Sequence, residues 1–274
     1  MDHRVVELVV CVLCTDFANT VIWESWRADD MNPDAAKRIG FITHPRPDNR
    51  WFVPYSVAAP IDTRWGDSSL VQAELVLLSE AVSRFPNARQ FLVVSGDTVP
   101  IRTKEDFFEY FLNEEAKEVS VLTYSSDVCP VRSTDADELR RLGLAKLYNG
   151  HQFIALCRKH AEFLVSPEGR RSVLGLDAVR YHAPRYTGNF NPDEVYIQTV
   201  LRNTFPRAEF YNGRFVDFLP DGYHAKTLTL PEFETLYQHC LHTSTLYCIR
   251  KVCIQTQWEI FQFLGGEPGV VNFP

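Results

Sequence analysis

The sequence has no apolar run near the roughly 18 residues that a bilayer-spanning helix needs. One short apolar stretch, Leu8 to Cys14, lies close to the N-terminus, but Glu7 precedes it and it lacks a small-residue cleavage site. This stretch therefore predicts a first buried strand rather than a signal peptide. We expect a cytoplasmic protein with no membrane insertion.

The sequence also has no excess of positive charge and no regular cysteine framework. Its net charge is −7 and its isoelectric point is near 5.6, which argues against a nucleic-acid partner. Seven cysteines without regular spacing are atypical of a secreted disulfide scaffold, so a reduced protein is expected. Cys11 and Cys14 form a C-x-x-C inside a predicted strand, where residues three apart face opposite sides of the sheet. We favour buried structural cysteines there, with a redox or zinc site as the alternative.

What is present is typical of one folded domain spanning residues 1–274. The chain is 45% hydrophobic and 23% charged, and it shows no internal repeat or low-complexity linker. The sequence predicts strands at 5–14, 38–43, 91–94, 118–124, 150–157 and 246–254, and helices at 68–84, 104–113, 158–165, 195–203 and 231–240. Strands that alternate with helices over the first half predict an α/β fold with a mostly parallel central sheet flanked by helices.

Ligands of such sheets bind beyond the carboxyl ends of the strands. Three polar segments directly follow predicted strands, namely Thr15-Asp16, Thr43-His44 and Ser95-Gly96-Asp97. We expect these segments to line one shared crevice.

The segment from Asn191 to Glu194 has two interpretations. In the structural one, Asn191 is a helix N-cap, Pro192 is the first helical residue and Glu194 completes a capping box. In the functional one, the Glu194 carboxylate at a helix start beside a cleft is an available base. The local sequence favours the structural interpretation, and the two are compatible because helix starts often hold site residues rigidly.

Arg250 and Lys251 are adjacent cations inside an apolar stretch, and Lys226 lies in a short polar turn. Charged side chains are rarely buried without a partner, so the pair is a candidate to bind an anion. Solvation at the protein surface is the ordinary alternative for each cation.

Seven segments, in order along the chain, resemble the motifs of one enzyme family. They are R-W-G-D-S-S-L-V at 64–71, F-L-V-V-S-G-D-T-V-P-I at 91–101, G-H-Q-F-I-A-L-C-R-K-H at 150–160, P-D-E at 192–194, R-F-V-D-F at 214–218, H-A-K-T-L at 224–228 and I-R-K-V at 249–252. The family is that of the core-2/I-branching N-acetylglucosaminyltransferases and peptide xylosyltransferases. Asp97 stands one place earlier than the family's aspartate, and Phe218 stands where the family usually has an acceptor-stacking tryptophan.

The resemblance implies a GT-A-like, Rossmann-like fold. It also implies transfer of a sugar from a UDP-sugar to a glycan or glycoprotein with inversion, and no metal or other cofactor. By position, Glu194 matches the family's catalytic base, and Lys226 and Lys251, with Arg250 beside it, match the cations that hold the diphosphate. The other predicted site residues are Thr15, Asp16, His44, Trp65, Gly66, Ser95, Gly96 and Asp97 for the donor, and Asp193, Asp217 and Phe218 for the acceptor. On this basis residues 1–125 form a nucleotide-binding half and residues 126–274 an acceptor-binding and catalytic half.

Aromatic residues add candidates for sugar stacking. Phe218, Tyr211 and Trp65 could each cover a sugar face, although aromatic side chains in such places more often pack in a core.

The sequence leaves the substrate and the class of protein open. The short form without an anchor most resembles the xylosyltransferases of large algal viruses, which favours UDP-xylose and, for a viral protein, the host cytosol. A UDP-GlcNAc-dependent β-1,6-N-acetylglucosaminyltransferase is the alternative enzyme, and a non-catalytic sugar-nucleotide or glycan-binding module is the rival from another class. The absence of a G-x-S-x-G motif argues against an α/β hydrolase.

Asp135 and Asp137 form the chain's D-x-D triplet, the pattern that often holds a divalent metal on a sugar nucleotide. The triplet opens a helical stretch, where acidic residues have a simple explanation in the helix dipole. A metal site at Asp135 and Asp137 is therefore the less favoured alternative.

Overall fold

The computed structural model describes residues 5–14, 20–28, 33–47, 55–129, 133–182, 191–221, 224–243 and 246–264. Thr15 and Asp16, two of the predicted donor-site residues, lie outside this part of the chain. Within it, no helix combines the length and the hydropathy that crossing a bilayer would require.

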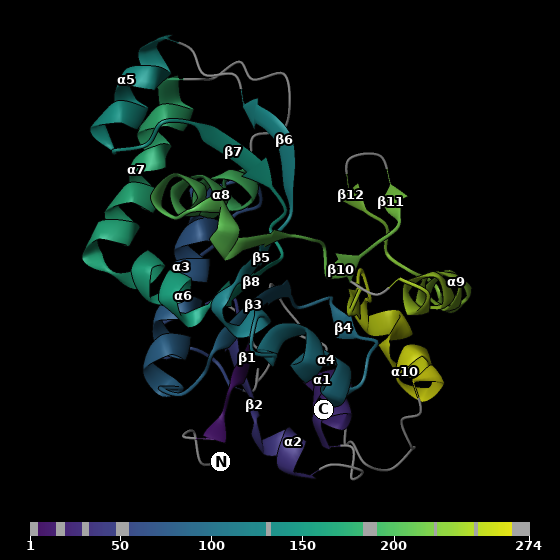
Figure 1. Ribbon diagram of the computed structural model, residues 1–274. Coiled ribbons are helices and arrows are strands. Elements are labelled where there is room, and N and C mark those ends of the chain that lie inside the picture. The colour runs from purple at the N-terminus through teal and green to yellow at the C-terminus, as the bar shows by residue number, and fades with distance from the viewer. Residues whose placement is uncertain are drawn as a thin grey trace.

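A six-stranded sheet forms the centre of the molecule (Figure 1), in the order β2-β1-β3-β8-β5-β9. The strands are β1 (Leu8–Leu13), β2 (Ile39–His44), β3 (Gln90–Ser95), β5 (Ser120–Leu122), β8 (Ile154–Cys157) and β9 (Phe210–Asn212). Only β8 is antiparallel to its neighbours, and every other neighbouring pair is parallel. The predicted α/β fold with a mostly parallel central sheet is confirmed, and the sheet takes strands from both halves of the chain.

Each face of the sheet is covered by helices and has its own apolar core (Figure 1). One face packs against α3 (Ser68–Arg84), α6 (Arg158–Val165), α7 (Pro167–His182) and α8 (Pro192–Thr204), and the other against α1 (Thr20–Ala28) and α4 (Lys104–Leu112). Side chains of β1 alternate between the cores, since Val9 and Cys11 belong to the first and Val10 and Val12 to the second. Cys14 belongs to the second core, so the two cysteines of the C-x-x-C contribute to opposite sides of the sheet and are both buried.

A smaller lobe packs beside the carboxyl ends of the central strands (Figure 1). It contains a three-stranded sheet in the order β10-β13-β4, the helices α9 and α10, and a third apolar core. Its elements are β4 (Val99–Pro100), β10 (Val216–Asp217), β13 (Cys248–Ile249), α9 (Leu230–Leu241), α10 (Ile254–Phe263) and the hairpin of β11 (Pro220–Asp221) and β12 (His224–Ala225).

The remaining elements decorate the central domain. They are α2 (Pro33–Lys37), α5 (Ser133–Arg141), the strand pair β6 (Tyr124–Cys129) and β7 (Leu147–Gly150), and the 3₁₀ turns η2 (Ala116–Glu118) and η3 (Arg207–Glu209).

The predicted strand 246–254 is wrong in extent. Only Cys248 and Ile249 pair as a strand, and Arg250 and Lys251 follow it. The backbone then turns toward separate partners, because Val252 N–H donates to the Asp97 carbonyl at 2.9 Å and the Lys251 carbonyl accepts from Leu228 N–H at 3.0 Å. The cation pair therefore lies in a connecting segment rather than within a two-faced strand.

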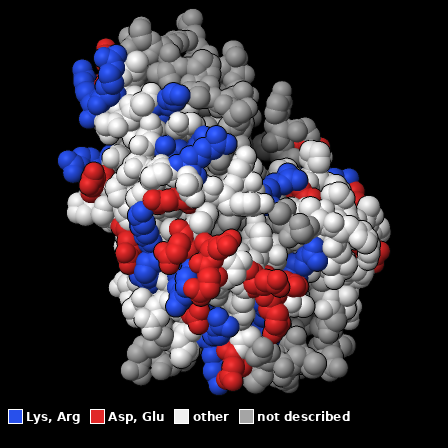
Figure 2. All heavy atoms as spheres, in the orientation of Figure 1, with Lys and Arg blue, Asp and Glu red and all other residues white. Residues whose placement is uncertain are grey.

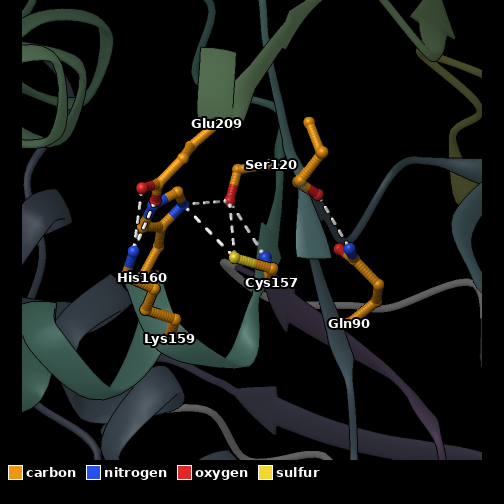
Figure 3. A network of polar contacts seen from close by, with 7 residues as sticks. Gln90, Ser120, Cys157, Lys159, His160 and Glu209 are labelled. Atoms are coloured by element: carbon orange, nitrogen blue, oxygen red, sulfur yellow. Dashed lines mark hydrogen bonds and ion pairs between the residues drawn. The ribbon is translucent and has the colours of Figure 1, made fainter. Parts of the chain in front are cut away.

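A buried polar chain joins β5, β8, α6 and η3 (Figure 3). Ser120 Oγ accepts from the Cys157 N–H at 2.9 Å and lies 2.7 Å from His160 Nδ1, while His160 Nε2 lies 3.0 Å from Glu209 Oε2. A cysteine, a histidine and a glutamate in this order resemble a nucleophile and its base. However, Ser120, Cys157 and His160 are at most 1% exposed, and burial raises the pKa of the Cys157 thiol. A substrate cannot reach the sulfur. This network of hydrogen bonds therefore links β5, β8, α6 and η3 and is not a reactive site.

The face of the molecule drawn in Figure 2 carries acidic and basic side chains close to one another. No broad area of positive charge covers the described residues on this face. Any anion site here must therefore come from a few converging side chains.

Candidate active site

The carboxyl ends of β1, β2 and β3 meet at one edge of the central sheet. Leu13, the last residue of β1, is in register with His44 of β2 and Ser95 of β3. His44 is buried, and its Nε2 accepts a hydrogen bond from the Ile61 N–H at 3.1 Å. Burial lowers the pKa of His44, which keeps the ring neutral and suited to this acceptor role. His44 is thus at the predicted edge, and one of its ring nitrogens is already used by the backbone.

The loop after β3 is joined to the segment after β13. Ser95 Oγ donates to Asp97 Oδ1, and Asp97 Oδ2 accepts from Arg250 Nη2 at 3.2 Å. The Asp97 carbonyl also accepts the Val252 N–H at 2.9 Å. Arg250 therefore lies at the carboxyl edge of the sheet, beside the predicted crevice.

Arg250 is the cation at the centre of this site. Its side chain is 16% exposed, and its guanidinium carbon lies 4.9 Å from the centroid of the Phe153 ring. Its Nε is buried and donates to no described residue, so the guanidinium keeps hydrogen-bonding capacity. The Arg250 charge also acts on two neighbours. It opposes the rise in the pKa of Asp193 that burial causes, and it adds to the fall in the pKa of His151 that burial causes.

Glu194 lies in the first turn of α8, and it is not part of a capping box. Asn191 is the N-cap and Pro192 opens the helix, as the sequence predicts, but the Asn191 side chain caps no backbone N–H. It bonds the Glu194 carboxylate instead. The capping-box interpretation is therefore wrong. The Asn191 side-chain amide, which would accept a hydrogen bond from a backbone N–H of the first turn, bonds the Glu194 carboxylate. The Glu194 carboxylate is left available for chemistry.

The surroundings of Glu194 favour a base that works near neutrality. Burial raises the pKa of Glu194 to about 7, with a further rise from the negative charge of Asp193 and a smaller opposing effect from the Asn191 hydrogen bond. Burial likewise raises the pKa of Asp193, and the Arg250 charge opposes that rise. Glu194, Asp193 and Arg250 thus form one electrostatic cluster, in which Asp193 acts on the candidate base and Arg250, the candidate cation, acts on Asp193.

Asp177 of α7 fixes the start of α8 against α3. Its Oδ2 accepts from Ser68 Oγ at 2.7 Å, and its Oδ1 accepts from the Tyr196 hydroxyl at 2.8 Å. Gly66, just before α3, adopts φ = +68°, and a Cβ there would lie 3.8 Å from Asn191 Oδ1. The predicted Trp65-Gly66 segment therefore lies beside the N-cap of α8, and Trp65 itself is 72% exposed.

Glu74 of α3 is a site residue that the sequence interpretation missed. The side chain is 2% exposed, and its Oε2 receives no hydrogen bond from the described residues. Burial, followed by the charge of Asp193, raises the pKa of Glu74 well above its ordinary value. Glu74 is therefore a buried carboxyl group on which the Asp193 charge acts. The signal in the sequence was weak, because an acidic residue in an amphipathic helix is ordinarily exposed.

We expect Glu74→Gln to stabilise the protein increasingly as pH rises. The folded pKa of Glu74 is raised, so its contribution is complete below the unfolded value near 4.5 and is lost toward higher pH. Over the pH range in which Glu74 is protonated in the folded state but ionised in the unfolded state, the free energy of unfolding falls by about 1.4 kcal/mol per pH unit. Urea unfolding of both proteins at pH 5 and pH 8 measures the difference. Glu162→Gln, at an exposed position of α6, is the matched control. If the stability difference between Glu74→Gln and the wild type were the same at pH 5 and pH 8, the assignment would be contradicted.

The two predicted lysines differ in their surroundings. Lys226 forms an ion pair with Glu232 at the surface, which raises the pKa of Lys226, and its side chain is 45% exposed. Lys251 makes no side-chain hydrogen bond or ion pair with the described residues, and it directly follows Arg250. Of the two, Lys251 is the cation with unused charge next to the cluster.

The predicted acceptor residues Asp217 and Phe218 lie on the small lobe. Asp217 is 4% exposed and forms an ion pair with Arg214. Phe218 is partly exposed, with the Arg214 guanidinium 5.7 Å and the His151 ring 5.6 Å from its own ring centroid. Asp217 therefore orients Arg214. Of Asp217 and Phe218, only Phe218 has a partly exposed side chain that an acceptor could contact.

The D-x-D triplet lies in α5, which Figure 1 shows far from α9 and α10, the helices of the small lobe. Asp137 is exposed and pairs with Arg140 at 2.9 Å, whereas the Asp135 side chain lies outside the description. Across the described part of the chain, no three His, Cys, Asp or Glu side chains gather as a metal site would require.

The model of the core-2/I-branching enzyme family matches residues 46–238. The chain belongs to this family. The match includes Gly66, Asp97 and Glu194 and ends before Arg250. It spans α3, α8 and the central strands from β3 onward, so the family's defining sequence coincides with most of the site.

Individual relatives are distant. The chain is 22% identical over 204 residues to "Glycosyltransferase BC10" of Oryza sativa subsp. japonica, which is 66% of this chain and 49% of that protein. The chain thus spans about half the length of this relative. It also aligns, at 12% identity and a TM-score of 0.42, with a glycosyltransferase involved in the glycosylation of the major capsid of PBCV-1, over 94% of this chain and 98% of that one.

Proposed function

We propose that the protein is an inverting, metal-independent glycosyltransferase that moves a sugar from a UDP-sugar to a hydroxyl of a glycan or glycoprotein. The observation that carries this proposal is the state of Glu194. Its carboxylate is released from helix capping, its pKa is raised to about 7, and it shares a cluster with Arg250. Membership of the core-2/I-branching enzyme family supports the same class of reaction.

The proposed reaction is an in-line displacement at the anomeric carbon. Glu194 takes the proton of the acceptor hydroxyl while that oxygen bonds to the anomeric carbon. The bond from this carbon to the phosphate oxygen breaks on the opposite side, and its electron pair leaves with UDP. A positioned base of this kind contributes about 10²- to 10⁴-fold in rate, and a pKa near the working pH suits the role.

Negative charge grows on the departing β-phosphate, and fixed cations stabilise it. Arg250 offers a planar fork and Lys251 a point charge, the two ways in which proteins hold phosphate oxygens. Lys226 can join them, because an exposed ion pair such as Lys226–Glu232 is weak and exchanges readily. In this proposal the cations take the place of a metal ion, and the fold is of the GT-A-like type.

UDP-xylose is the first choice of donor and UDP-GlcNAc the second. The preference comes from the resemblance to algal-virus xylosyltransferases, and acceptor contacts are proposed at Asp193, Asp217 and Phe218. A non-catalytic sugar-nucleotide-binding module is the remaining candidate. The raised pKa of Glu194 favours the enzyme, because binding a sugar nucleotide does not need a base.

Thermal unfolding with UDP-xylose, UDP-GlcNAc and UDP-glucose, each with and without EDTA, tests the donor. A ligand that binds only the folded state raises the melting temperature, and we expect the same rise with EDTA present. Release of UDP in the presence of glycan acceptors then separates an enzyme from a binding module. Loss of activity in EDTA with recovery in manganese would contradict metal independence and favour Asp135 and Asp137.

A further inference from the structure

His151 lies between β7 and β8, at the point where the chain passes from the peripheral strand pair to the central sheet. Its ring centroid is 4.8 Å from that of Phe153 and 5.6 Å from that of Phe218. Its carbonyl accepts a hydrogen bond from Gln198 Nε2 of α8 at 2.9 Å. The ring is therefore held between two aromatic side chains while its backbone is tied to the helix that carries Glu194.

The hydrogen bonds of His151 fix which ring nitrogen carries the proton. Nδ1 lies 3.3 Å from the Phe153 backbone nitrogen and accepts its N–H. A neutral imidazole has one acceptor and one donor nitrogen, so the proton is on Nε2. Among the described residues, no group accepts a hydrogen bond from this Nε2–H.

Burial and two guanidinium groups keep this ring neutral. Burial, followed by the charges of Arg250 and Arg214, lowers the pKa of His151 to about 4. The ring therefore remains an uncharged donor at neutral pH and cannot act as a general acid there. Two guanidinium groups lie nearby and the Nε2–H is unused. Such surroundings favour the binding of an anionic oxygen.

We propose that His151 donates its Nε2–H to an anionic oxygen of the diphosphate held beside Arg250 and Lys251, and so positions the leaving group. The inference rests on the proposed function and adds a residue to it.

The ordinary alternative is that His151 only fills space between Phe153 and Phe218. Two variants separate these roles. His151→Phe keeps an aromatic ring and removes the donor, whereas His151→Gln keeps an amide N–H near the position of Nε2 and removes the ring. His239→Phe, on the exposed side of α9, is the matched control.

The measurement is calorimetric titration of each protein with UDP, followed by donor KM and kcat. We expect the Kd for UDP and the donor KM of His151→Phe to rise about 10-fold or more, because a hydrogen bond to a charged group contributes about 1.5–3 kcal/mol. His151→Gln should stay within about 3-fold of the wild type, and His239→Phe should be unchanged. Equal melting temperatures show that the variants are folded.

The outcomes also separate this inference from the function on which it rests. If the wild type binds no UDP, the proposed function fails. If the wild type binds UDP and His151→Phe binds it equally well, only the role of His151 is overturned. Equal losses in His151→Phe and His151→Gln would likewise overturn it, since an N–H kept near the position of Nε2 would then fail to preserve UDP binding.

Discussion

Glu194→Gln should lower kcat by about 10²- to 10⁴-fold and leave UDP affinity nearly unchanged. Glutamine keeps the size and the hydrogen bond to Asn191 but cannot accept the proton of the acceptor hydroxyl. Because the side chain acts on the acceptor, the contacts of the nucleotide remain in place. Steady-state kinetics with a fixed acceptor and calorimetric titration with UDP measure the two quantities separately.

The pH dependence of the wild type gives a second check on Glu194. Its raised pKa near 7 means that the base is protonated below that pH, so kcat/KM should fall tenfold per pH unit on the acid side. Glu168→Gln is the control for Glu194→Gln, since Glu168 also lies in the first turn of a helix that begins with a proline, α7. Turnover of Glu194→Gln close to that of the control would show that another group takes the proton.

Arg250→Met should reduce both activity and stability. The variant removes the charge that balances Asp97 and Asp193, and breaking such a partly buried pair typically costs about 2–4 kcal/mol. It also removes a donor to the leaving phosphate, which is worth about 10²- to 10³-fold in kcat. Thermal or urea unfolding and donor kinetics report the two effects.

Arg250→Lys and Arg140→Met complete this experiment. Lysine restores charge without the fork, so we expect most of the stability to return and only part of the activity. Arg140 forms an exposed pair with Asp137, and its loss should change neither quantity measurably. An Arg250→Met variant that is less stable but fully active would show that Arg250 has only a structural role.

Strands β1, β2 and β3 could be predicted because they are buried on both faces and read as continuous apolar runs. Strand β9 was missed, because it is three residues long and two of them are exposed. Helices α3 and α6 begin and end where the amphipathic pattern predicts. Helix α7 was missed, although Pro167 and Glu168 form a helix-start signal, because its apolar residues are spread among charged ones.

The site was predicted in part for a different reason. Motif order identified Glu194 and Arg250, and strand ends identified Ser95 and Asp97, because both signals are local in the chain. The contacts that adjust these groups were not readable, since Glu74 and Asp177 reach α8 from other helices. The Asn191 side chain could bond either a backbone N–H or the Glu194 carboxylate. The packing of α8, and not the local sequence, decides between them.

The proposed base and the proposed leaving-group cation belong to separate parts of the fold. Glu194 is carried by α8, which packs on α3 and α7, whereas Arg250 belongs to the lobe built on α9 and α10. The spacing between them is set where Asp97 holds the segment after β13. Small displacements of that lobe would therefore alter the gap between the two groups, where we propose that the sugar binds. Substitutions in the apolar interior of the lobe are then expected to change turnover without touching a substrate.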